Sequence, residues 1–232
     1  MAINTIELIH LIKKRQADKL YIGQPFGSAI KYKRKELGLT LEEASEDICS
    51  VSYLSKVENN AIHASEEYID KFKERFDLTD AYDYDLDTYR QHLDQVIDAC
   101  INDLKIDKSL VSYYEDRVDY QSIIITYAYY VLNNDYEMSK KMYHQVIAMI
   151  SSMPHESFVV SMIITNHIFF QNMNYSDGMH ILKLTERQRP HSDEVSLLIM
   201  KWRLIYAFKL NNHYLIQKNF KNYERDLIRK QL

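Results

Sequence analysis

Glycine and proline are scarce in this sequence. Its 232 residues include 4 glycines and 3 prolines, so few positions favour a sharp turn. The prolines, Pro25, Pro154 and Pro190, stand where helices could begin or end. Because 46% of the residues are hydrophobic, a chain of this length can bury a sizeable core. Together these features predict an all-α fold.

Cysteines are few and long apolar runs are lacking. Cys49 and Cys100 lie far apart in the sequence and match no metal-binding spacing, so we expect no metal site and no cofactor. The sequence shows no signal peptide and no apolar run of about 18 residues. We therefore expect a cytoplasmic protein without a membrane partner.

Sequence motifs of catalysis are also missing. The 9 histidines form no His-Glu-x-x-His pattern, and there is no glycine-rich phosphate loop and no nucleophile elbow. The aspartates between residues 77 and 87 lack the glycine and the terminal glutamate of a calcium-binding loop. We therefore expect a protein that is not an enzyme.

Positive charge is concentrated near the N-terminus. The whole chain has a net charge of −4. Residues 1–41 nevertheless carry eight lysines and arginines against three acidic residues, if the letters of that segment are counted. This distribution predicts a positive N-terminal surface on an otherwise mildly acidic protein.

Helix signals crowd the first third of the chain. An amphipathic pattern predicts a helix over 5–20, within an N-terminal segment 1–22. A second helix over 25–37 ends at Gly38, and Thr40 with Glu43 forms a capping box for a third. Further helices are predicted over 50–59 and, opened by Ser65, over 65–76. Residues 23–79 are therefore expected to form a compact helical domain.

The rest of the chain, residues 80–232, repeats itself. After helices predicted near 84–106 and 109–117, equivalent residues recur every 39 positions. They are Asn133, Asn172 and Asn211; Tyr136, Tyr175 and Tyr214; Tyr130, Phe169 and Phe208; and Ser139, Gly178 and Gln217. A fixed period of this length predicts an α-solenoid of antiparallel helix pairs, with the aromatic and small residues at packing positions. The alternative is chance similarity in a chain with 19 tyrosines.

The stretch "FGSAIKYKRKELGLTLEEASEDICSVSYLSKVENN" resembles the helix-turn-helix of Xre-type, phage-repressor-like regulators. The matching positions are Arg34, Gly38-Leu39-Thr40, Glu42-Glu43, Ser52, Leu54-Ser55 and Glu58. Within that class, "DICSVSYLS" is most similar to the Rgg/PlcR (RRNPP-like) group. Members of this group join such a domain to TPR-like repeats that bind short signalling peptides in quorum sensing. The resemblance implies a homodimeric transcriptional regulator acting on a palindromic double-stranded DNA operator.

The resemblance places the recognition helix at residues 50–59. Helical spacing turns Ile48, Leu54 and Val57 inward and leaves polar side chains facing out, where they can reach base edges or phosphates. The expected DNA-binding residues are Lys31, Thr40, Ser50, Ser52, Tyr53, Lys56, Asn59 and Asn60. Arg34 and Glu58 are expected to form a structural pair. Leu41 stands where many relatives have glutamine, which implies an altered sequence preference.

On a TPR-like array the first helix of each pair lines the concave face. The residues expected there to bind an extended peptide are Gln121, His167, Phe170, Gln171, Trp202, Tyr206 and Lys209. The alternative for each is packing against a neighbouring helix. At the level of function, two alternatives to peptide sensing stay open, namely a ligand-independent repressor and a protein-interaction scaffold.

Overall fold

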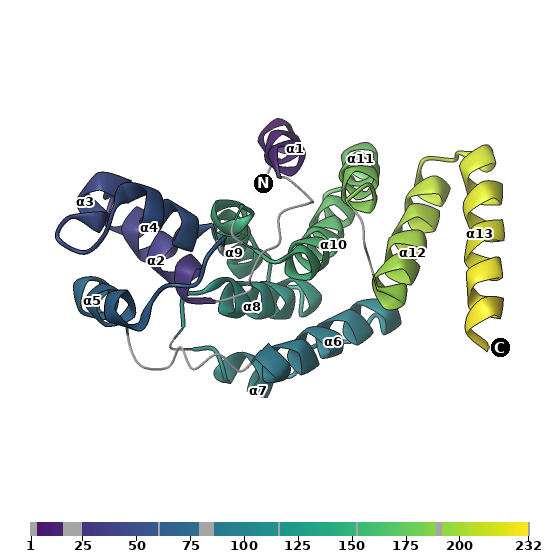
Figure 1. Ribbon diagram of the computed structural model, residues 1–232. Coiled ribbons are helices and arrows are strands. Elements are labelled where there is room, and N and C mark those ends of the chain that lie inside the picture. Colours follow the sequence, from purple (N-terminus) through teal and green to yellow (C-terminus); the bar gives the residue numbers. More distant parts are fainter. Residues whose placement is uncertain are drawn as a thin grey trace.

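The structure is a computed structural model that describes residues 4–15, 25–59, 61–78, 86–115, 117–151, 153–188 and 192–231. Within α13, side chains are described only at residues 213–221 and 224. All regular secondary structure in these ranges is helical, which confirms the predicted all-α class (Figure 1). None of the described helices is long and apolar enough to cross a membrane.

Four short helices form the small domain at one end of the molecule. They are α2 (Pro25–Glu36), α3 (Leu41–Ser45), α4 (Val51–Glu58) and α5 (Glu66–Phe76). Gly38 ends the α2 turn with a φ of 70°, which suits glycine. The predicted capping box is present, because Thr40 Oγ1 accepts from the Glu43 amide at 3.2 Å and the Glu43 carboxylate accepts from the Thr40 amide at 2.7 Å.

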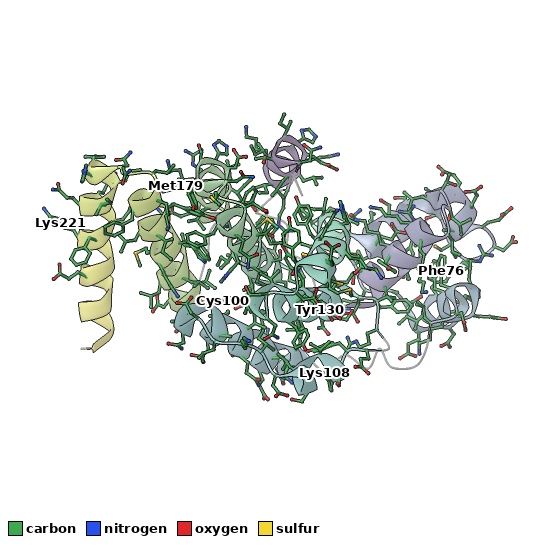
Figure 2. All side chains as sticks on the ribbon, turned by 180° about the vertical axis from the view of Figure 1, so that it is seen from behind. Phe76, Cys100, Lys108, Tyr130, Met179 and Lys221 are labelled. Atoms are coloured by element: carbon green, nitrogen blue, oxygen red, sulfur yellow. The ribbon has the colours of Figure 1, made fainter. Side chains whose placement is uncertain are left out.

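The core of this small domain is built from apolar residues of all four helices and the segment after α5. Its buried members are Phe26, Ala29, Ile30, Ala44, Leu54, Val57, Phe72, Phe76 and Leu78. Phe76 at this end and Lys221 of α13 at the other mark the length of the molecule (Figure 2). The small domain therefore has its own hydrophobic centre, separate from that of the remaining helices.

Helix α1 (Thr5–Lys14) precedes the small domain in sequence but packs against α11 of the repeat array. Thr5 Oγ1 donates to the Asp177 carboxylate at 2.9 Å, and Gln188 Nε2 donates to the Ile12 carbonyl at 2.7 Å. The helix was predicted to continue to residue 20, but Arg15 already has extended backbone angles. Residues 16–20 lie outside the described part of the chain.

Six helices form the predicted array of antiparallel pairs. They are α8 (Tyr120–Leu132), α9 (Tyr136–Met149), α10 (His155–Gln171), α11 (Tyr175–Glu186), α12 (Asp193–Lys209) and α13 (His213–Gln231). Within each pair, a residue with positive φ reverses the chain: Asn134, Met173 or Asn211. Stacked pairs of this kind are the architecture that the 39-residue spacing indicates.

The third pair departs from the predicted register. The positive-φ residues Asn134 and Met173 are 39 positions apart, but Asn211 follows Met173 by 38. The prediction that Phe208 is a packing residue like Phe169 is therefore wrong. Phe169 is fully buried, whereas Phe208 is 54% exposed and Ala207 is buried beside it.

Helix α6 (Leu86–Asn102) lies across the first helices of all three pairs, α8, α10 and α12 (Figure 1). At its start, the Tyr89 hydroxyl hydrogen-bonds the Ser157 hydroxyl at 2.7 Å. At its end, the Lys201 ammonium donates to the carbonyls of Cys100 and Ile101 at 3.2 and 2.7 Å. A short α7 (Lys108–Ser112) then leads to α8. Helix α6 thus packs on the same first helices that were predicted to line a peptide-binding trough.

The small domain contacts the array through α2, which packs against α8 and α9. Ser28 Oγ accepts from the Tyr120 amide at 3.0 Å, and Gln145 Nε2 donates to the Tyr32 hydroxyl at 3.0 Å. The orientation of the small domain is therefore tied to the first pair of the array.

Candidate nucleic-acid interface

Helix α4 is held so that one side of its N-terminal half faces outward. Ser50 caps the helix, its Oγ accepting from the Tyr53 amide at 3.2 Å. Leu54 and Val57 are buried in the core of the small domain, as predicted, while Ser50, Val51 and Ser52 are exposed. A helix anchored along its inner side in this way presents its first turn to a partner.

The C-terminal end of α4 is fixed by the predicted pair of Arg34 and Glu58. Arg34 Nε and Nη2 donate to the two carboxylate oxygens of Glu58 at 2.6 and 2.8 Å. Arg34 Nη1 also donates to the Leu39 carbonyl at 2.9 Å, so the same guanidinium holds the turn after α2. The hydrogen bond to Glu58 raises the pKa of Arg34 above its ordinary value. The pair therefore joins α2, this turn and α4.

Four of the eight predicted DNA-binding residues are exposed: Thr40, Ser50, Ser52 and Lys56. The hydroxyls of Thr40 and Ser50 already accept backbone amides as helix caps. Ser52 and Lys56 are four residues apart and so lie on the same side of α4. These two side chains are the best placed to contact base edges or phosphates.

Tyr53 was predicted to face outward but is half-buried. Its hydroxyl accepts from the Ser65 amide at 2.9 Å and donates to the His63 carbonyl at 3.4 Å. Its ring meets that of Tyr68 edge-on, with 5.0 Å between centroids. The segment before α5 folds back over this side of α4, so Tyr53 holds that segment in place.

Lys31 was predicted to contact phosphate, but it is only 7% exposed. Its ammonium donates to Asn59 Oδ1 at 3.1 Å and to Ser151 Oγ at 2.5 Å. Burial, with a smaller contribution from Lys35, lowers the pKa of Lys31 to about 8. Half-buried Asn59 also donates to the Ser55 carbonyl, and predicted Asn60 lies outside the described residues.

Two further residues at this site, Val51 and Ser151, were not predicted from the sequence. Val51 is 36% exposed beside Ser50 and Ser52, where its methyl groups could contact a thymine methyl. Its place in the first turn of the recognition helix was the available signal. Ser151 binds Lys31 from the array, and no local pattern in the sequence marks such a long-range contact.

The predicted peptide-binding residues on α10 and α12 form an aromatic cluster. The ring of Trp202 lies 4.6 Å from that of His167, 5.8 Å from Phe170 and 5.5 Å from Tyr206. The Lys209 ammonium lies 5.4 Å from the Phe170 ring centroid. Burial lowers the pKa of His167 to about 4, so its imidazole is neutral at pH 7. These residues contact one another, which is the packing alternative raised from the sequence.

The exposure of the seven predicted trough residues varies. Gln121, Trp202 and Tyr206 are buried, His167 and Phe170 are half-buried, and Gln171 and Lys209 are exposed. Gln121 lies apart from the cluster, where its Oε1 accepts from Arg117 at 2.7 Å. Trp202 Nε1 and His167 Nε2 are covered and have no hydrogen-bond partner among the described residues. Only the rim of the predicted trough is therefore open.

Comparison with known proteins agrees with the geometry of the small domain. Residues 30–82, from the middle of α2 through α5, match the Helix-turn-helix family, so this domain is an Xre-type helix-turn-helix. No curated protein matches the chain. Among solved structures, the chain is similar to Bacillus thuringiensis PlcR in complex with the peptide PapR7 and DNA. That likeness has 16% sequence identity and a TM-score of 0.49, and it covers 90% of this chain and 81% of that chain.

Proposed function

We propose that the protein is a sequence-specific DNA-binding transcriptional regulator. The observation that carries this proposal is the arrangement of α4 within the helix-turn-helix domain. Its C-terminal end is locked by Arg34 and Glu58, while Ser50, Val51 and Ser52 at its start remain exposed. In a helix-turn-helix, the N-terminal residues of the second helix reach base edges in the major groove.

Each exposed residue of α4 has a chemistry that suits a duplex. The Ser52 hydroxyl can donate to or accept from a base edge, and the Lys56 ammonium can bind phosphate or guanine. The N-terminal end of α4 also carries the positive end of the helix dipole, which would favour a phosphate beside it. These contacts would combine sequence reading with placement on the backbone.

The proposed regulator acts as a homodimer on a palindromic operator. A two-fold dimer presents two copies of α4, and their spacing selects half-sites about one helical turn, roughly 34 Å, apart. The array is the larger part of the chain and is the proposed dimerisation unit.

We further propose that the rim of the array senses a short extended peptide. Exposed Gln171 can bond a peptide backbone, half-buried Phe170 offers an apolar contact, and exposed Lys209 can meet a carboxylate. The unpartnered Trp202 Nε1 lies in the same cluster and would gain a hydrogen bond if a ligand displaced a neighbouring side chain. Binding would alter DNA affinity only if the peptide prefers one arrangement of the DNA-binding domains.

A ligand-independent repressor or scaffold is the second candidate. It is favoured by the burial of Gln121 and Tyr206 and by the cover that α6 provides over the first helices. In this case the array would serve only for assembly.

Selection of bound duplexes from a random pool tests DNA recognition. We expect a palindromic consensus, with log affinity falling linearly against log salt concentration. Lys56→Ala should weaken binding to the selected duplex. Lys183 is exposed on α11, far from α4, so Lys183→Ala removes the same charge at a distant position. This variant is the matched control, and its affinity for the selected duplex should change little. A pool without any preferred sequence would overturn the proposal.

A further inference from the structure

A cavity of about 270 Å³ lies between the DNA-binding domain and the array. One wall comes from α2 and the other from α9, two helices that contact each other. The lining residues are Lys31, Tyr32, Lys35 and Glu36 of α2 and His144, Gln145, Ala148 and Met149 of α9. The cavity therefore spans the junction at which the two parts of the chain meet.

Two ammonium groups at this cavity lack a carboxylate partner among the described residues. The Lys31 ammonium donates to the neutral oxygens of Asn59 and Ser151. Among the residues that the structure describes, the Lys35 ammonium hydrogen-bonds only the Ala148 carbonyl, at a long 3.4 Å. Like charges four residues apart on one helix repel each other, so both cations are held at a cost in stability.

The neighbouring carboxylates are already engaged elsewhere. Glu36 also lines the cavity, but its carboxylate accepts from Lys33 at 3.0 Å. Glu58 is bound by Arg34 through both oxygens. Burial lowers the pKa values of both Lys31 and Lys35, neighbouring cations lower them further, and the negative charge of Glu58 partly opposes this. An added negative charge would therefore find two cations whose neighbouring acids, Glu36 and Glu58, already bind other cations.

We propose that this cavity is a binding site for a small anion that carries a phosphate or carboxylate group. A water molecule takes about 30 Å³ in the liquid, so the cavity has room for such a group and a compact organic part. The carbon atoms of Tyr32, Ala148 and Met149 would surround the organic part. The ammonium of Lys35, which is exposed, is open to an arriving anion.

Occupation of the site would stiffen the junction between the domains. An anion bound by Lys31 and Lys35 would also touch α9, and so would join α2 to the array. Lys31 in turn holds Asn59, the residue that ends α4, so the ligand would act on the recognition helix itself. This consequence rests on the proposed DNA-binding function, whereas the anion site does not.

Calorimetry on the full chain without DNA tests the site. Inorganic phosphate and succinate are titrated separately at constant ionic strength, which distinguishes a phosphate site from a carboxylate site. We expect saturable binding of at least one, and an affinity at least about tenfold weaker in Lys35→Ala. Lys183 on α11 is exposed and does not line the cavity, so Lys183→Ala is the control and should keep the wild-type affinity.

Two results would overturn the site. One is no saturable binding of either probe. The other is an equal loss of affinity in Lys183→Ala and Lys35→Ala, which would mean general attraction to a positive surface. A melting experiment gives a second reading, because a ligand of the folded state raises Tm as its concentration increases. The rise should be present in wild type and lost in Lys35→Ala. If the anion binds but leaves DNA affinity unchanged, the site is supported and only its link to DNA binding is overturned.

Discussion

Gly178 of α11 lies directly against the phenol group of Tyr206 of α12. A methyl group at Gly178 would overlap the Tyr206 hydroxyl and the ring carbon that bears it. The ring has little freedom to move away, because its hydroxyl donates to the Asn166 carbonyl at 2.9 Å and the side chain is fully buried. This close approach sets the distance between the second and third pairs.

We therefore expect Gly178→Ala to lower the free energy of unfolding by about 1–3 kcal/mol, the usual range for overpacking a core. Ser176 is exposed on the same helix, and Ser176→Ala should stay within about 0.5 kcal/mol of wild type. Chemical denaturation of the three proteins measures both. Equal stability of all three would show that Tyr206 can yield to the added methyl group.

Removing one member of the Arg34 and Glu58 pair should destabilise the small domain. Glu58 has only 3% of its side chain exposed, so Arg34→Ala leaves a buried carboxylate without its partner. We expect a loss of about 3–5 kcal/mol for Arg34→Ala or Glu58→Ala. Lys33→Ala on the same helix removes a partly exposed cation and should do little. Thermal and denaturant unfolding measure the stability of the three variants. Equal stability of all three would contradict this prediction.

Ser52 and Tyr53 are adjacent, but we expect opposite consequences when they are changed. Ser52→Ala should alter base preference at one position, by about 1–3 kcal/mol for a lost base contact. Tyr53→Phe should leave base preference intact and cost about 1 kcal/mol of stability, because the Ser65 amide loses its acceptor. Binding to a panel of single-base operator variants separates the two effects. A changed preference in Tyr53→Phe would show that its hydroxyl reaches DNA.

The buried ammonium of Lys31 should make stability depend on pH in the alkaline range. Its folded-state pKa is lowered from 10.5 to about 8, so burial penalises the charged form. Between these values the unfolded chain binds the proton and the folded chain does not, and stability therefore rises with pH. Relative to Lys31→Met, wild type should gain up to about 3 kcal/mol from pH 8 to 10.5.

Denaturant unfolding of both proteins across this window measures the Lys31 effect as a difference, which removes the titration of other groups. The difference should be flat below pH 8, where both states are charged. A flat difference throughout would mean that the folded-state pKa of Lys31 is ordinary and that its ammonium is well solvated.

The proposed peptide site depends on the rim of the cluster. Gln171→Ala and Lys209→Ala should each weaken a peptide selected from a library by about 1–2 kcal/mol, as for a lost hydrogen bond or charge contact. Both residues are exposed, so both variants should fold, with Gln171→Ala losing the hydrogen bond from Gln171 Nε2 to Asn134 Oδ1. Lys183→Ala serves as the control for net charge. Calorimetry that finds a binder insensitive to both rim changes would place the peptide elsewhere.

Local signals in the sequence predicted the helices well. The capping box at Thr40 and the glycine at residue 38 are short-range features, and the structure has both. The pairing of Arg34 with Glu58 was predicted from a resemblance to a known domain, and the two side chains do form a salt bridge. The array of helix pairs was also predicted from the 39-residue period, but the turn within the third pair lies one residue earlier than this period predicts. The repeated letters Asn211 and Tyr214 suggested an unbroken 39-residue spacing, whereas the backbone reverses one residue earlier.

Contacts between distant segments could not be predicted in the same way. The cover of α6 over the array joins residues that are far apart in the chain and leaves no periodic trace. The burial of Lys31 depends on Ser151, which is 120 positions away. Tyr53 was assigned outward from the spacing of α4 alone, because that spacing does not reveal how the segment before α5 folds back.

Helix α6 also changes how the array should unfold. In a simple solenoid each repeat touches only its neighbours, so terminal repeats fray and the chain loses structure step by step. Here one helix binds the first, second and third pairs at once, with Tyr89 near one end and Lys201 holding the other. No single pair can detach without breaking contacts that the others share. The array should therefore lose its structure in one cooperative transition, and its curvature should resist the stretching that open solenoids allow.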